Sequence, residues 1–181
     1  SLDGNAAWKR RRRYEEDLVD RWRTASPAAK QAPAWIEQLV LAADQFIVRR
    51  PLAEDQEGQP SGPMEGRAEG MSVIAGYHWF GDWGRDTMIA LPGLARTTGQ
   101  FREAWLALEG FAAHLKDGIL PNRFADTGGE PEYNTVDASL WLAVAIWRLE
   151  RTDRRTDGPM VCPDSLVEAL KQIESHYTKG T

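Results

Sequence analysis

The stretch YHWFGDWGRDTMIALPGL, Tyr77 to Leu94, places a charged Arg85-Asp86 pair between an aromatic-rich turn and an apolar run. Charged side chains are costly in apolar surroundings unless they have a partner. The apolar residues after the pair recur at helical spacing, so a helix is expected to start near Asp86 or Thr87. The stretch therefore predicts a loop that holds a flat, polar ligand in front of a helix.

Helical spacing of apolar residues recurs along the chain and predicts an all-α fold class. The expected helices cover residues 6–24, 34–49, about 86–99, 101–115, 137–150 and 164–177. Pro92 lies inside the third of these, so that helix is expected either to begin late or to be kinked. The short apolar run from Met71 to Ala75 is interpreted either as a strand or as the approach to the turn.

Two long segments between the helices differ in character. Residues 51–70, PLAEDQEGQPSGPMEGRAEG, are rich in proline and glycine and predict a flexible loop. Residues 116–136 also connect two helices, and so long a connection in a compact domain is more often functional. We expect residues 1–33 to form a polar helix and linker, and residues 34–181 to form the main domain.

Composition and charge limit the classes of partner. The formal net charge is −5, which gives no general attraction to nucleic acid or anionic membranes. The basic run Lys9 to Arg13 is followed at once by acidic residues, which favours a charged helix face over a nucleic-acid patch. The single cysteine, Cys162, excludes an intrachain disulfide and favours a reducing compartment. With no apolar run near the ~20 residues of a membrane span and no secretory signal, we expect a cytoplasmic protein.

Metal and cofactor chemistry is not expected. The three histidines, His78, His114 and His176, lack the spacing of known metal motifs. The sequence also has no GxSxG nucleophile turn and no glycine-rich phosphate loop. We therefore expect neither a metal ion nor a cofactor.

Two carboxylates, Asp86 and Asp137, each lie where a helix is expected to start. Aspartate is a favoured N-cap, worth ~1 kcal/mol, and this structural interpretation stays open for both. Their neighbours favour a binding or catalytic role: Trp79, Trp83 and Arg85 lie beside Asp86, and Asn122, Arg123, Tyr133 and Asn134 precede Asp137. The two loops precede alternate helices, so in an antiparallel helical array they are expected to meet at one end.

This mixture of side chains is typical of sugar recognition. Aromatic faces cover the apolar side of a pyranose, while Arg, Asp and Asn bind its hydroxyls. An adjacent Arg-Asp pair suits two neighbouring hydroxyls, one side chain donating and the other accepting. A carboxyl near aromatic walls is expected to have a raised pKa, which suits a general acid that protonates a glycosidic oxygen.

Three motifs, AGYHWFGDWGRDTMIALPGL, GILPNRFAD and EYNTVDASLWLAVA, resemble the amylo-α-1,6-glucosidase domain of bacterial and archaeal glycogen debranching enzymes. The resemblance covers about residues 35–150 and implies an (α/α)6 barrel with its active site at one end of the inner helices. It implies removal of one α-1,6-linked glucose from a trimmed branch of glycogen or a branched maltooligosaccharide, with inversion. By the same resemblance, Arg85 and Asp86 grip the sugar beside Trp83, and Asp137 is the general acid.

The resemblance also implies that part of the site lies elsewhere. The family's general base falls in the second half of the barrel, and the six expected helices amount to the first half. We therefore expect this chain to lack the base and to be inactive, or nearly so, by itself. Uncovered half-barrel faces would favour association, so a homodimer or a swapped assembly is expected.

Two alternatives remain open from the sequence. The first is another glycosidase on the same barrel, such as a glucoamylase-like or trehalase-like enzyme, because linkage is read by groups that bind the far side of the scissile bond. The second is a carbohydrate-binding fragment that keeps Arg85 and Asp86 and does not hydrolyse.

Overall fold

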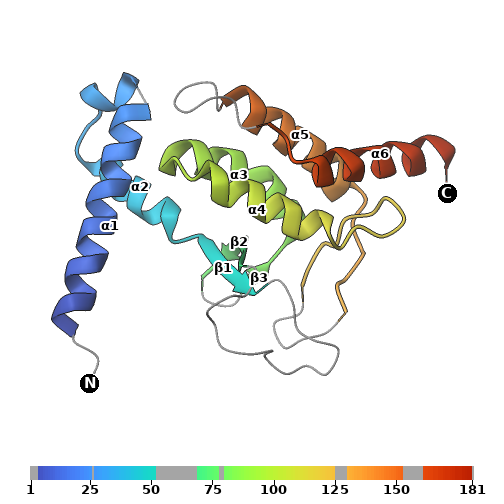
Figure 1. Cartoon of the computed structure of the whole chain (residues 1–181), viewed down its shortest axis with the longest axis horizontal. Coiled ribbons are helices and arrows are strands. Elements are labelled where there is room, and N and C mark those ends of the chain that lie inside the picture. The colour runs from blue at the N-terminus through green and yellow to red at the C-terminus, as the bar shows by residue number, and fades with distance from the viewer. Residues whose placement is uncertain are drawn as a thin grey trace.

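The computed structural model describes residues 4–25, 27–51, 69–77, 80–124, 130–152 and 161–180, and Figure 1 shows their arrangement. Within these ranges the chain is mostly helical, as the sequence predicts. The described α-helices are α1 (Gly4–Ala25), α2 (Trp35–Asp44), α3 (Gly84–Thr98), α4 (Phe101–Ala112), α5 (Asp137–Thr152) and α6 (Asp164–Lys179), with a short 3₁₀ helix η1 (Pro27–Gln31) after α1. None of these described helices is both long and apolar enough to cross a membrane.

A small antiparallel sheet, only partly predicted from the sequence, joins α2 to α3. Its strands are β1 (Ile47–Pro51), β2 (Glu69–Gly76) and β3 (Phe80–Asp82), in the order β1-β2-β3. The helix expected over residues 34–49 is wrong at its end, since α2 stops at Asp44 and the β-branched Ile47 and Val48 pair with β2. The strand interpretation of residues 71–75 is confirmed.

The loop expected over residues 51–70 is wrong at both ends. Pro51 closes β1, Glu69 and Gly70 open β2, and Pro51 faces Glu69 in the register. Backbone pairing across the sheet fixes these positions, which a composition-based prediction does not see. Residues 52–68 lie outside the described residues.

Helix α3 carries the opening stretch of sequence into the core. It begins at Gly84, so the late start is wrong, and Pro92 lies in its buried interior. A proline there leaves the carbonyl of Met88 without its usual intrahelical partner, and burial of Leu91 and Pro92 on the core side offsets the loss. Gly99 ends the helix as expected, in a left-handed conformation with φ of 69°.

The main hydrophobic core lies between α3, α4, α5, α6 and β2. Among the helix pairs, α3 and α5 make the most extensive contact. Leu91 and Ala95, one turn apart on α3, are fully buried, as their spacing predicts. The other fully buried members are Ala104, Ala107, Leu108, Leu120, Ala138, Leu142, Ala145, Leu149 and Leu166. This core holds α3 against α5, which brings residues at their N-terminal ends together.

Helix α1 packs through a second, smaller core at the side of the molecule away from α6 (Figure 1). Its apolar stripe, Leu18, Val19 and Trp22, is buried against Val40 of α2. Helix α2 in turn contacts both α1 and α3. The domain boundary between residues 33 and 34 therefore stays a prediction.

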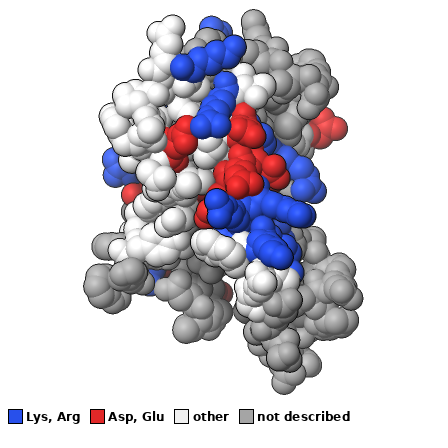
Figure 2. Space-filling model, turned by 90° about the vertical axis from the view of Figure 1, so that its left-hand side faces the viewer, with Lys and Arg blue, Asp and Glu red and all other residues white. Residues whose placement is uncertain are grey.

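The outer surface on the α1 side carries charges of both signs. Figure 2 shows Lys and Arg side chains interspersed with Asp and Glu on this face. Arg11 lies 2.6 Å from Glu15 and Arg12 lies 3.4 Å from Glu16, each pair one helical turn apart. The interpretation of the basic run as a charged helix face is confirmed.

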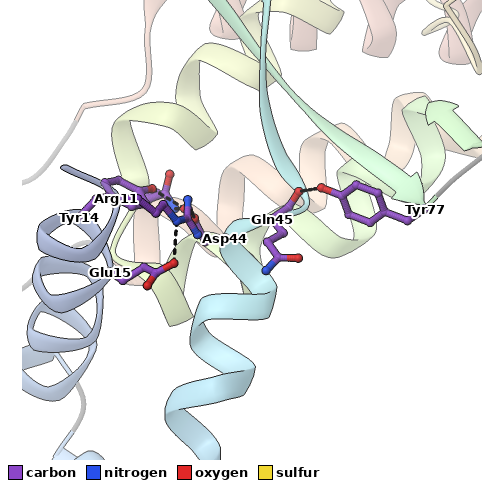
Figure 3. Close-up of polar contacts among 7 residues, drawn as sticks. Arg11, Tyr14, Glu15, Asp44, Gln45 and Tyr77 are labelled. Carbon is purple, nitrogen blue, oxygen red and sulfur yellow. Dashed lines mark hydrogen bonds and ion pairs between the residues drawn. The ribbon is translucent and has the colours of Figure 1, made fainter. Parts of the chain in front are cut away.

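A buried carboxylate, Asp44, ties α1 to the main core (Figure 3). It accepts hydrogen bonds from the Tyr14 hydroxyl and from Nε2 of Gln100, the latter at 2.7 Å, and Arg11 lies 3.7 Å from its other oxygen. Asp44 is 7% exposed, and a buried charge is tolerated when it is paired and hydrogen-bonded. Because Gln100 directly precedes α4, three helices are joined at this carboxylate.

The junction predicts a pH dependence in alkaline solution. Burial, and then the hydrogen bond to Asp44, raises the pKa of Tyr14 from 10.0 to about 12. The folded protein favours the neutral phenol, so this stabilisation is fully present below pH 10 and is lost as the pH rises toward 12. We expect the free energy of unfolding, measured with urea, to fall more steeply over this range in the wild type than in Tyr14→Phe. Equal slopes in the two proteins would contradict the prediction.

Candidate active site

The two loops that the sequence predicts to meet do so at the start of α3. Trp83 and Arg123 form an antiparallel backbone bridge. The Gly84 amide donates a hydrogen bond of 2.7 Å to the Asn122 carbonyl, and the Phe124 amide donates one of 3.3 Å to the carbonyl of the residue before Trp83. Paired backbone of this kind fixes the register of two segments, so the expectation of a shared end is confirmed.

The second loop is folded back on itself and anchored to α5. The Asn122 amide donates to the Glu132 carbonyl at 2.7 Å, and the Glu132 amide donates to the Arg123 carbonyl at 2.9 Å. The Leu120 amide donates to the hydroxyl of Ser139 at 2.8 Å, and both of these side chains are fully buried. The loop is therefore held at α3 by backbone pairing and at α5 by a side chain.

Gly84 is placed where no side chain fits. A Cβ at this position would lie 2.1 Å from the carbonyl oxygen of Pro121. This is far inside van der Waals contact, and the atom in the way belongs to the backbone rather than to a flexible side chain. The close approach of the two loops therefore requires glycine at position 84.

Arg85 and Asp137 connect the first turns of α3 and α5. Nε of Arg85 lies 3.1 Å from Oδ2 of Asp137, and the side chains are 55% and 40% exposed. The sequence pairs Arg85 with the adjacent Asp86, but the Asp86 side chain is exposed and makes no hydrogen bond or ion pair with another side chain in the described part of the chain. The capping interpretation is wrong for Asp86, because Trp83 is the N-cap of α3 and no side chain caps that helix.

Two further pairs form among the residues singled out from the sequence. Nδ2 of Asn122 donates a hydrogen bond of 2.8 Å to Oδ1 of Asn134. The guanidinium of Arg123 lies over the Trp83 ring, 5.8 Å from its centroid. Together they place amide donors and acceptors, a cation and an aromatic face at the meeting point of the loops.

The remaining site residues are less directly engaged. The Tyr133 hydroxyl donates to the carbonyl of His114 at 2.8 Å, and burial, followed by the charge of Glu130, raises the pKa of Tyr133. Trp79 and its neighbour His78 lie outside the described residues. Among the residues that the structure describes, no group of three or more His, Cys, Asp or Glu side chains is arranged to hold a metal ion.

The surroundings of Asp137 favour its charged form. The hydroxyl of Thr135 donates a hydrogen bond of 2.7 Å to Oδ1 of Asp137. The pKa of Asp137 is lowered, chiefly by this hydrogen bond; desolvation opposes the shift, while the charge of Arg85 and a hydrogen bond from Trp141 add to it. The raised pKa expected from the aromatic neighbours is therefore wrong here, because a cation and hydrogen-bond donors outweigh the loss of water.

Sequence reasoning missed several residues that shape this site. Thr135 lies two positions before Asp137, a spacing at which a hydroxyl readily reaches a nearby polar group. Trp141 follows Asp137 by one helical turn and so shares its face of α5. Glu132, whose carboxylate lies 3.6 Å from Arg123, gave no comparable signal because its partner depends on how the loop folds.

The anchor at Ser139 gives a measurable prediction. Ser139→Ala leaves the buried Leu120 amide without a partner, which costs about 1–3 kcal/mol. We expect the free energy of unfolding in urea to fall by this amount. The matched control is Ser165→Ala, which removes an exposed bond of 2.6 Å to Glu109 and is expected to change stability by about 0.5 kcal/mol or less. An equal loss in the free energy of unfolding from both substitutions would show that the buried bond at Ser139 contributes no more to stability than the exposed bond at Ser165.

Comparison with known proteins shows which family the sequence around this site resembles. Residues 41–181 match the family model described as amylo-alpha-1,6-glucosidase. One similar curated protein is the glycogen debranching enzyme of Saccharomyces cerevisiae, which is 44% identical over 64 residues. The matched stretch is 35% of this chain and 4% of the yeast enzyme, so the chain corresponds to a small part of that relative.

Proposed function

Because this chain belongs to the amylo-α-1,6-glucosidase family, we propose that it hydrolyses α-1,6-linked glucose at trimmed branch points of glycogen-like glucans. Family membership supports a glycoside hydrolase role. The observation that carries the finer proposal is the 3.1 Å contact between Arg85 and Asp137 where the two loops meet. It puts a carboxyl group, a cation and the Trp83 face within one small region.

Asp137 is the proposed general acid. As the glycosidic C–O bond breaks, its carboxyl proton passes to the leaving oxygen. In an inverting reaction a second carboxylate removes a proton from the attacking water, and no described residue is assigned to that step. The neighbours of Asp137 favour its charged form, so in the proposed reaction it gains its proton after the sugar has changed its surroundings.

The proposed sugar-binding residues surround this acid on both loops. They are Trp79, Trp83, Arg85, Asp86, Asn122, Arg123, Tyr133 and Asn134. Asp86 is an exposed acceptor next to Arg85, and the Asn122–Asn134 pair retains donors and acceptors beyond its mutual bond. Such convergent planar groups beside an aromatic face suit a hydroxylated ring.

The wider expectations from the sequence become part of the same proposal. The helices are proposed to belong to an (α/α)6 barrel, and the protein to act in the cytoplasm on glycogen or branched maltooligosaccharides. Large apolar side chains stay exposed on the paired helices: Ile89 of α3, and Leu140 and Trp147 of α5. Exposed apolar groups favour association, which supports the proposed homodimer; sedimentation of the chain as a monomer at all concentrations would exclude it.

One observation favours the non-catalytic alternative. Both oxygens of Asp137 are engaged by donors, and its pKa is lowered rather than raised. A site that only binds sugar has no need of a protonated carboxyl. A carbohydrate-binding role is therefore the second candidate.

The product of an assay with defined sugars separates these functions. The chain is incubated with an α-1,6-glucosyl-branched maltooligosaccharide, a linear maltooligosaccharide and trehalose, and calorimetry measures binding of each. Glucose from the branched substrate alone supports the proposal. Glucose from the linear sugar or from trehalose assigns a glucoamylase-like or trehalase-like reaction. Binding without release is expected both of a chain that lacks the general base and of the non-catalytic role. The same assay with a chain that carries both halves of the barrel separates these two: release there supports the hydrolase, and binding alone assigns the non-catalytic role.

A further inference from the structure

The carboxylate of Asp137 is divided between two partners of different kinds. Thr135 comes from the chain just before α5 and donates to Oδ1 at 2.7 Å. Arg85 comes from the first turn of α3 and faces Oδ2 at 3.1 Å. Thr135 is close in sequence and part-buried, whereas the Arg85 side chain is 55% exposed and comes from another helix. The first partner is therefore fixed locally, and the second is free to exchange its contact.

This arrangement conflicts with general-acid chemistry unless one partner moves. A general acid must carry a proton on an oxygen that faces the leaving group. A guanidinium has donors only, and its positive charge beside Oδ2 disfavours a proton on that oxygen, so protonation of Oδ2 becomes easier when Arg85 withdraws. Thr135 can stay in place, because its hydroxyl bonds to either form of the carboxyl.

We propose that Arg85 is a displaceable positioning residue for Asp137: it holds Oδ2 until a sugar hydroxyl takes its guanidinium, and Oδ2 then takes up a proton from water, while Thr135 keeps Oδ1 in place. The inference rests on the proposed function, since it needs a sugar that Arg85 binds. Under this proposal, Asp137 becomes protonated, and so able to act as the general acid, after a sugar has bound in the site. The proton taken up is the one later delivered to the glycosidic oxygen, so the carboxyl returns to its charged form after cleavage.

The Thr135 hydrogen bond is the chief cause of the lowered pKa of Asp137, and the positive charge of Arg85 adds to it. The segments that meet here also carry other charged or titratable side chains, among them Asp82 and Asp86 around the start of α3, Lys116, Asp117, Arg123, Glu130, Glu132 and Tyr133 of the second loop, and His176 and Tyr177 of α6. Arg123 is paired with Glu132 at 3.6 Å, and the Tyr177 hydroxyl donates to the carbonyl of Val136. Release of Arg85 is therefore the change that removes a positive charge from Oδ2.

The resting pair is tested without sugar. The pKa of Asp137 is measured from the pH titration of its carboxyl carbon by NMR in the wild type, Arg85→Gln, Thr135→Val and Thr135→Ser. We expect the pKa to rise in Arg85→Gln and in Thr135→Val, and to stay near the wild-type value in Thr135→Ser, which keeps the hydroxyl. Arg102→Gln, an exposed arginine near the start of α4, is the matched control and should leave the titration unchanged. No rise in Arg85→Gln, with a native amide spectrum, overturns the proposal.

The release is tested by adding isomaltose, an α-1,6-linked glucose disaccharide, to the same proteins. Binding is followed at the Trp83 indole resonance, independently of Asp137. We expect saturating sugar to raise the pKa of Asp137 in the wild type and in Thr135→Val, and to leave it unchanged in Arg85→Gln. Saturable binding with no change in the pKa overturns the release and leaves the proposed function standing. Absence of saturable binding counts against the proposed function, and the release fails with it.

Discussion

Replacing Asp137 with asparagine in the complete enzyme, in which the second half of the barrel supplies the general base, is expected to lower glucose release from an α-1,6-glucosyl-branched maltooligosaccharide by about 10²- to 10⁴-fold, the usual contribution of a general acid. Asparagine keeps the size and an acceptor oxygen for Thr135, so the bond at Oδ1 survives. It removes the charge that attracts Arg85 across 3.1 Å, which frees the guanidinium for sugar hydroxyls. We therefore expect sugar affinity to be kept or improved while turnover is lost.

A matched substitution separates this effect from a general loss of helix stability. Asp164 is an acidic residue at the first position of α6, as Asp137 is at the first position of α5. Asp164→Asn removes the same charge from a helix start away from the loops, where the expected cost is about 0.3–1 kcal/mol of stability. If Asp137→Asn and Asp164→Asn retain equal rates of glucose release, Asp137 is not the general acid.

Gly84→Ala is expected to destabilise the protein by about 3 kcal/mol or more, the upper end of the usual cost of overpacking. The new Cβ would lie 2.1 Å from the Pro121 carbonyl oxygen, so the second loop must move. Movement also strains the 2.7 Å bond from the Gly84 amide to Asn122. Because these contacts position both loops, sugar binding should fall together with the free energy of unfolding in urea.

The same helix supplies the control for Gly84→Ala. Gly93 lies in the interior of α3, and a Cβ there would meet nothing within 4 Å. Gly93→Ala is expected to raise stability by up to about 1 kcal/mol, because alanine has the higher helix propensity. Loss of stability from both alanines would mean that glycine in α3 matters for a reason other than the close approach at Pro121.

Patterns within single segments were sufficient to predict the helical class and most of the helices. The apolar spacing in residues 6–24 predicts a stripe of Tyr14, Leu18, Val19 and Trp22, of which the last three are buried while Tyr14 is 37% exposed. Leu91 and Ala95, whose spacing also indicates a buried helix face, are both fully buried. The end of α2 was not predictable in this way, because its continuation into β1 depends on pairing with residues that lie beyond a long intervening segment. At the end of α2, strand pairing in the tertiary structure outweighed the local helical periodicity.

In the candidate site, too, local sequence predicts some features, while others depend on tertiary pairing. The sequence predicts which residues gather at the loops, since Trp83, Arg123 and Asn122 carry the chemistry in their own side chains. It does not predict who pairs with whom: Arg85 faces Asp137 across two helix starts rather than its neighbour Asp86. The pKa of Asp137 is lowered chiefly by the Thr135 hydrogen bond and further by the pairing with Arg85, so the direction of the shift required the three-dimensional arrangement.

The backbone bridge between Trp83 and Arg123 also bears on the order of folding events. It joins residues about forty positions apart in the chain, and closing a loop of that length costs entropy before any contact repays it. Helices α3 and α4 follow one another directly and meet through local contacts, so they are expected to form first. In pulse-labelled hydrogen exchange, the amides of Gly84 and Asn122 should gain protection after those in the middle of α3 and α4. Protection of the Gly84, Asn122 and mid-helix amides in one early step would contradict this order. If the expected order holds, a folding intermediate with native-like helix content does not yet have its sugar site.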